Sequence, residues 1–122
     1  MITYLVQMNS AWEDKPASIA KARQFIAAAK PLASSLIVLP EMFATGFSIE
    51  TKITAEPEAG LTEQFLIDMA LEHRCAVIGG LVSQGGQKAG GDAARVLAAT
   101  AARAAREAGD DANGREYERL GR

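Results

Sequence analysis

The chemistry that this sequence could perform centres on one carboxylate. Glu41 follows the apolar run 36–39 (Leu-Ile-Val-Leu), which is typical of a strand buried on both faces. Pro40 ends that strand because it has no N–H to donate. A carboxylate directly beyond a buried strand lies at the mouth of a core, where partial desolvation favours a general base. A single Glu in such a place is more often a solvated loop residue, so position alone leaves both interpretations open.

The residues around Glu41 carry a resemblance. The segment 39–48 (Leu-Pro-Glu-Met-Phe-Ala-Thr-Gly-Phe-Ser) resembles the first catalytic motif of the nitrilase superfamily, the carbon–nitrogen hydrolases, and within it the omega-amidase branch. The resemblance implies that Glu41 is the general base and that Phe43, Thr45 and Phe47 shape the rim of the substrate pocket. It also implies a small-molecule amide substrate such as 2-oxoglutaramate, assembly as a homo-oligomer, and no cofactor or metal.

Family members pair this Glu with a Lys and a nucleophilic Cys that lie further along the chain. A thiolate attacks the carbonyl, while the Lys and a backbone N–H hold the oxyanion. Here Lys88 is the only Lys after Lys52, and it lies in a Gly-rich stretch. Cys75, at the start of a predicted strand, is expected to be a small buried hydrophobe rather than the nucleophile. We therefore expect the chain to be inactive alone.

The elements that position Glu41 alternate between strands and helices. Apolar composition and periodicity predict three strands and two helices in the order βαβαβ, with parallel strands. The expected strands are 2–8, 36–39 and 75–82, and the expected helices are 16–29 and 60–74. Asp14 is expected to cap the first helix and Thr62 the second. Residues 42–60 show no clear period and are expected to form a loop.

The fold class is therefore α/β. By resemblance, residues 1–85 are the N-terminal, incomplete part of the four-layer α-β-β-α sandwich of this superfamily. Residues 86–122 contain no Phe, Trp, Ile or Met and are rich in Ala, Gly and Arg. We expect them to form a helical or disordered tail that does not resemble the family, with helix propensity over 92–108. The abrupt change in composition raises the hypothesis of a shifted reading frame or an unrelated join; a natural short variant is the competing hypothesis.

Composition narrows the remaining functions. A net charge of −2 over 122 residues gives no reason to expect nucleic acid or an anionic membrane as a partner. The single Cys rules out an internal disulfide, and no signal peptide or membrane span is visible, which together favour the cytoplasm. An alternative function is a non-catalytic α/β interaction module that binds a partner through an open sheet face. A doubly wound nucleotide-binding domain is disfavoured because no Gly-rich loop follows the first strand.

Overall fold

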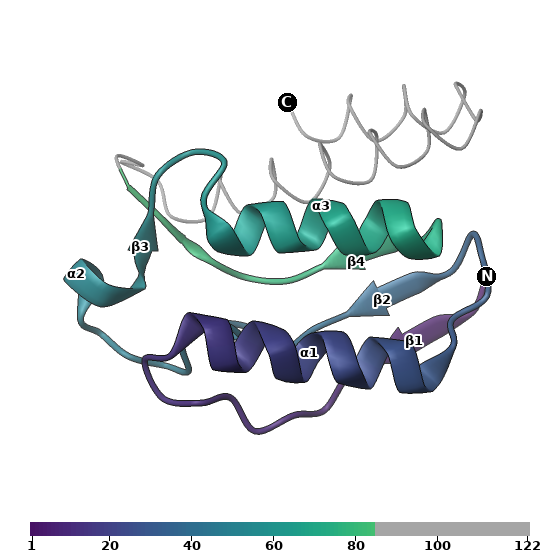
Figure 1. Cartoon of the computed structure of the whole chain (residues 1–122), viewed down its shortest axis with the longest axis horizontal. Coiled ribbons are helices and arrows are strands. Elements are labelled where there is room, and N and C mark those ends of the chain that lie inside the picture. The colour runs from purple at the N-terminus through teal and green to yellow at the C-terminus, as the bar shows by residue number, and fades with distance from the viewer. Residues whose placement is uncertain (85–122) are drawn as a thin grey trace.

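The computed structural model describes residues 1–84, in which helices and strands alternate (Figure 1). The strands are β1 (Thr3–Leu5), β2 (Leu36–Val38), β3 (Ala55–Glu56), β4 (Ala76–Ile78) and β5 (Val82–Ser83). The helices are α1 (Lys15–Ala29), α2 (Thr51–Thr54) and α3 (Leu61–His73). The predicted α/β class and both long helices are confirmed. Residues 85–122, including the tail helix predicted over 92–108, lie outside the described part of the chain.

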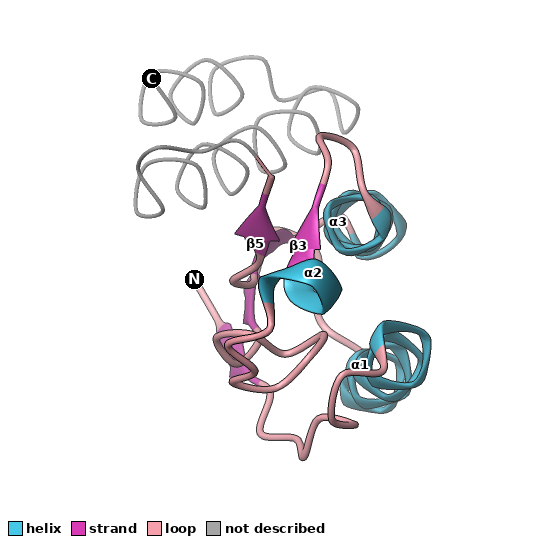
Figure 2. Cartoon of the chain, turned by 90° about the vertical axis from the view of Figure 1, so that its left-hand side faces the viewer, coloured by secondary structure: helices cyan, strands magenta, loops and turns pink. Residues whose placement is uncertain are grey.

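The main sheet has three parallel strands in the order β1-β2-β4. Its register places Thr3 opposite Leu36, and Leu36 opposite Ala76. Both long helices lie on the same side of this sheet, and α3 packs against α1 and β4 (Figure 2). Because parallel strands end at the same edge, the loops after β2 and β4 come together there.

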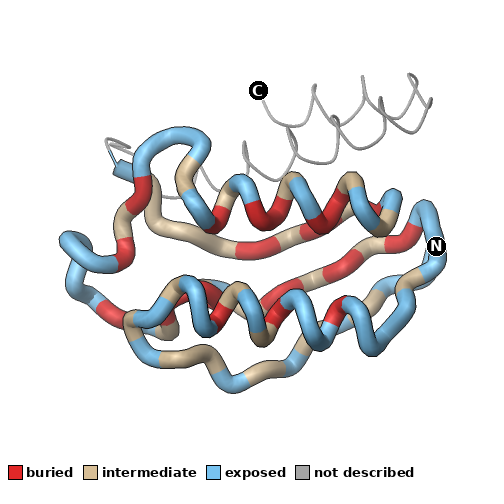
Figure 3. The backbone as a smooth tube through the Cα atoms, viewed as in Figure 1, coloured by how far each residue is buried: buried red, intermediate tan, exposed pale blue. Residues whose placement is uncertain are grey.

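The core lies between the helices and this sheet (Figure 3). Alternate strand residues face it: Ile37 and Val77 are each 1% exposed, whereas Leu36 and Val38 are half-buried. The expected burial of the run 36–39 on both faces is therefore wrong for the described residues. Leu5, on the outer β1 strand, is 77% exposed. The sheet face away from the helices is not covered by other residues of 1–84.

The segment predicted as a loop, 42–60, contains α2 and β3, and this part of the prediction was wrong. β3 is only two residues long and exists through parallel pairing with β5, which joins Ala55 to Val82. The single strand predicted over 75–82 is in fact β4 and β5, which belong to different sheets and are separated by Gly79 and Gly80. Pairing between segments distant in sequence leaves no local period, so the sequence pattern could not indicate it.

The helix ends agree with the sequence at α1 but not at α3. The Ala17 N–H donates to Asp14 Oδ1 at 3.0 Å, as predicted for an N-cap. The cap of α3 is Gly60, not Thr62, whose side chain lies one turn inside and is completely buried. Within residues 1–84, neither long helix has both the length and the apolar character needed to cross a bilayer.

Candidate functional site

Glu41 lies just beyond the end of β2, as the sequence predicts. The Leu39 N–H donates to Ile78 O at 2.8 Å, so pairing with β4 continues one residue past β2. Pro40 ends this pairing, and Glu41 begins a run of turns with its side chain exposed. The expected partial desolvation of Glu41 is therefore wrong for the described residues, because the turn carries the side chain away from the core.

The stem of Glu41 passes close to the end of the neighbouring strand. A Cβ atom built on Gly80 would lie 3.3 Å from Glu41 Cγ and 3.4 Å from the Met42 nitrogen. These distances are at the tight end of carbon contacts, so the missing side chain of Gly80 allows the two loops to approach. Glu41 thus projects from the edge where β2 and β4 both end.

The segment from Glu41 to Ser48, here called the Glu41 loop, is a compact turn. The Phe43 N–H donates to Pro40 O at 3.1 Å, and the Gly46 N–H donates to Met42 O at 2.8 Å. Gly46 has a φ of +72°, the conformation that the sequence predicted Gly to permit here. These bonds give the loop a defined shape without a helix or strand.

The predicted rim residues have three different surroundings. Phe43 is fully buried, with its ring centroid 5.7 Å from that of Phe65, so it anchors the loop in the core and does not lie at an open rim. Thr45 is 4% exposed and its hydroxyl donates to Gly46 O at 2.9 Å. Phe47 is 69% exposed. Of the three predicted rim residues, only Phe47 presents its side chain to solvent.

The turn before α1 contacts the Glu41 loop through residues that the sequence analysis did not single out. The Glu13 N–H donates to Thr45 O at 2.9 Å, and the Ser48 hydroxyl donates to Glu13 Oε1 at 2.6 Å. Trp12 is 64% exposed, yet its ring lies against Gly46, where a Cβ would be 3.1 Å from Trp12 Cε3. No sequence signal distinguishes Glu13 from an ordinary turn residue, because its role depends on a contact with residue 48.

Comparison with known proteins agrees with this arrangement of strand, Pro40 and Glu41. Residues 5–107 match the carbon–nitrogen hydrolase family. This chain belongs to the carbon–nitrogen hydrolase family. The match includes Glu41 and continues past residue 85, where the sequence analysis placed the end of the family-like part.

One curated relative is a nitrilase from Pyrococcus abyssi. It is 31% identical over 86 residues, which is 66% of this chain and 33% of the nitrilase. The match therefore spans about a third of the length of that carbon–nitrogen hydrolase. No solved structure is significantly similar to the chain.

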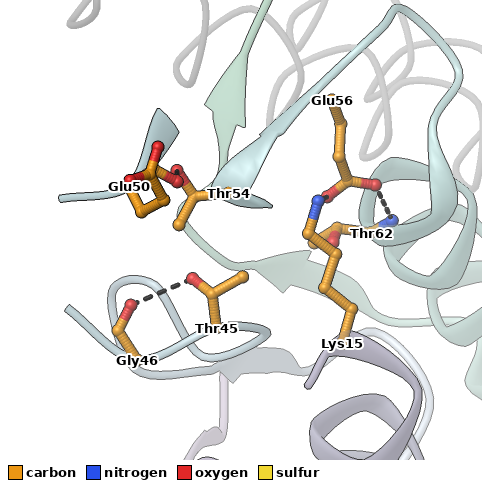
Figure 4. A network of polar contacts seen from close by, with 7 residues as sticks. All are labelled: Lys15, Thr45, Gly46, Glu50, Thr54, Glu56 and Thr62. Atoms are coloured by element: carbon orange, nitrogen blue, oxygen red, sulfur yellow. Dashed lines mark hydrogen bonds and ion pairs between the residues drawn. The ribbon is translucent and has the colours of Figure 1, made fainter. Parts of the chain in front are cut away.

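A second carboxylate, Glu56, lies in a buried polar cluster (Figure 4). Its Oε1 accepts the Thr62 N–H at 2.8 Å, at the N-terminus of α3, and its Oε2 lies 3.4 Å from Lys15 Nζ. The Glu56 and Lys15 side chains are only 7% and 15% exposed. Gly60 makes room for Glu56, since a Cβ there would lie 2.9 Å from Glu56 Cβ. Sequence analysis placed Glu56 in a featureless loop; an acid shortly before a helix start was the available signal.

Cys75 lies at the opposite end of the sheet from Glu41. It precedes the level of Leu36, whereas Glu41 follows Leu39, so the two are separated by at least about 10 Å along the strands. The thiol is 2% exposed and donates to Leu32 O at 3.2 Å. Burial raises the pKa of the Cys75 thiol, and a backbone hydrogen bond from Ser35 opposes this effect. The prediction of a small buried residue is confirmed for Cys75.

Acidic, His and Cys side chains do not gather into a cation site in the described region. Among residues 1–84, no three of them are placed to hold a metal ion. His73 lies in the last turn of α3, where its Nε2 is 3.9 Å from Glu72 Oε1. This position is the surface and helix-end setting expected of an isolated His.

Proposed function

We propose that this chain supplies the general-base part of a site that hydrolyses the carbon–nitrogen bond of small linear amides, such as 2-oxoglutaramate. The observation that carries the proposal is the position of Glu41, solvent-accessible at the edge where β2 and β4 end. Membership of the carbon–nitrogen hydrolase family supports it. The omega-amidase-like preference rests on the residues of the Glu41 loop.

In the proposed reaction, the Glu41 carboxylate accepts the proton of a cysteine thiol as the thiolate attacks the amide carbon. The same proton passes to the departing nitrogen as the C–N bond breaks and ammonia leaves. Glu41 then removes a proton from the water that hydrolyses the thioester. Phe47 is placed to contact the substrate, and Phe43 and Thr45 fix the loop beneath it.

The thiol for this reaction is not Cys75, because Cys75 is buried at the far end of the sheet. It is also the only Cys in the 122 residues. We therefore expect the purified chain to release no ammonia from 2-oxoglutaramate. Ammonia release that disappears in Glu41→Gln would contradict this expectation and point to Cys75 as a nucleophile after all.

A chimera tests the role of Glu41 directly. Residues 1–84 would replace the matched segment of the Pyrococcus abyssi nitrilase, and ammonia release would be measured on a panel of small linear amides and nitriles. We expect turnover with the native residues and a loss of at least about 100-fold with Glu41→Gln, the usual contribution of a general base. Glu58→Gln, an exposed acid outside the Glu41 loop, is the matched control. Equal turnover in the Glu41 and Glu58 variants would refute the proposed role.

A second candidate function is a non-catalytic α/β interaction module. The observation that favours it is the 77% exposure of Leu5 on a sheet face that residues 1–84 leave uncovered. Self-association through this face would also produce the homo-oligomer expected from the family. Size-exclusion chromatography of the native chain and of Leu5→Lys tests it: a defined oligomer that dissociates in the variant supports the module, whereas identical elution opposes it.

A further inference from the structure

One residue of the turn before α1 contacts the Glu41 loop at two places. The backbone N–H of Glu13 donates to Thr45 O at 2.9 Å, and its carboxylate accepts the Ser48 hydroxyl at 2.6 Å. Thr45 and Ser48 are 4% and 7% exposed, so both bonds are largely shielded from water. Shielded hydrogen bonds are stronger than exposed ones because little solvent competes with them.

The Glu41 loop connects these two bonds to Glu41 itself. The N–H groups of Thr45 and Gly46 both donate to Met42 O, at 3.1 and 2.8 Å. Met42, next to Glu41, has a φ of +55°, a conformation that a residue other than Gly keeps only when its surroundings enforce it. A displacement of Thr45 would therefore move Met42 and the stem of Glu41 beside Gly80.

The turn that carries Glu13 is itself fixed to α1. The Asp14 N–H and the buried Ser18 hydroxyl both donate to Ala11 O, at 3.3 and 3.1 Å. Asp14 also caps the helix. Glu13 has a φ of +55°, so it too holds a backbone conformation that its neighbours determine. The support for the Glu41 loop is therefore an extension of a 15-residue helix.

We propose that Glu13 is a positioning residue that holds the Glu41 loop so that Glu41 stays at the edge beside Gly80. The inference rests on the proposed role of Glu41 as general base. Glu13 is not a second base, because its carboxylate is half-buried and already accepts the Ser48 hydroxyl. It acts through Thr45, Ser48 and Met42.

The test compares the full chain with Glu13→Ala, Glu13→Gln and Ser48→Ala by NMR. Two readouts are used: the hydrogen-exchange rates of the Thr45 and Gly46 amides, and the ¹³C chemical shift of the Glu41 carboxyl. We expect Glu13→Ala and Ser48→Ala to speed exchange of these amides by about tenfold relative to α1 amides, the effect of losing one shielded hydrogen bond. We expect both variants to move the Glu41 signal as well. Glu13→Gln keeps an oxygen that accepts the Ser48 hydroxyl, so it should restore both readouts.

Glu72→Ala is the control, because Glu72 makes an exposed ion pair with Arg23 at 2.9 Å on the helical side of the sheet. It should change neither readout. Unchanged Gly46 exchange in Glu13→Ala, a Gln variant that behaves like the Ala variant, or equal acceleration throughout α1 would each overturn the proposal. None of these measurements uses catalysis, so failure of the positioning role and failure of the proposed reaction are seen separately.

Discussion

Two glutamates, Glu41 and Glu56, lie at the ends of short parallel strands in opposite surroundings. Glu41 follows β2 with its carboxylate exposed. Glu56 ends β3 with its carboxylate buried between Lys15 and the first turn of α3. A buried carboxylate with a cation and an N–H as partners is committed to holding elements together. An exposed carboxylate on a braced loop remains available to a reacting group, so local surroundings separate structural from chemical roles more clearly than residue type.

Replacing the two glutamates in turn is the strongest test of this comparison. Glu56→Ala leaves Lys15 and the Thr62 N–H without their partner, so we expect the free energy of unfolding to fall by about 3–5 kcal/mol. Glu41→Ala should change it by no more than about 0.5 kcal/mol, because the side chain is exposed. Urea denaturation of both variants measures the difference. Equal destabilisation by the two substitutions would remove the distinction.

The adjacent glycines after β4 sharpen the comparison at smaller magnitude. A Cβ on Gly79 would lie 2.8 Å from Phe43 Cε1 and 3.0 Å from Leu66 Cδ2. Gly79→Ala should therefore reduce the free energy of unfolding by about 1–3 kcal/mol through overpacking. Gly80→Ala meets the flexible stem of Glu41 at 3.3 Å, so we expect less than about 1 kcal/mol. A larger loss from Gly80 than from Gly79 in thermal denaturation would contradict the packing described here.

The buried cluster also contains one removable defect. The Thr62 hydroxyl is buried and has no hydrogen-bond partner among residues 1–84. Thr62→Val keeps the shape and removes this polar atom, so we expect the free energy of unfolding to rise by about 1 kcal/mol. The exposed Thr51, which begins α2, provides the control, because Thr51→Val should leave stability nearly unchanged. Destabilisation by Thr62→Val would mean that the hydroxyl has a partner in solution.

Cys75 gives the smallest effect, seen as a pH dependence. Burial raises its pKa above the ordinary value of 9.0, so the folded state holds the thiol proton more tightly than the unfolded state. This contribution to stability is fully present below pH 9 and is lost as the pH rises above it. Comparing urea midpoints of the native chain and Cys75→Ala from pH 7 to pH 10 isolates it. A difference that stays constant over this range would show that the pKa is not raised.

The sequence predicted the parts of the fold that depend on local patterns. The apolar stripe and the Asp14 cap indicated α1, and short β-branched runs indicated the strands of the main sheet. β3 and β5 were missed because each is two residues long and depends on the other. The α-β-β-α sandwich and the tail stay predictions, since they concern more than residues 1–84.

The site was predicted in the same uneven way. Pro40 after an apolar run placed Glu41 correctly at the strand end, but the exposure of Glu41 depends on the path of the following turn. Phe43 was expected at a pocket rim because aromatic residues beside a catalytic motif often contact substrate. Its burial depends on Phe65, which lies on another element. Glu13 and Glu56 were not identified because their partners are distant in sequence.

Trp12, whose ring lies against Gly46, has a practical consequence for work in solution. It is the only tryptophan in the chain, so all indole fluorescence comes from this position. The ring is 64% exposed and touches the Glu41 loop, so separation of the turn from the loop would change its emission and its quenching by iodide or acrylamide. The protein therefore carries a built-in optical probe that follows the Glu41 loop at micromolar concentration without any label.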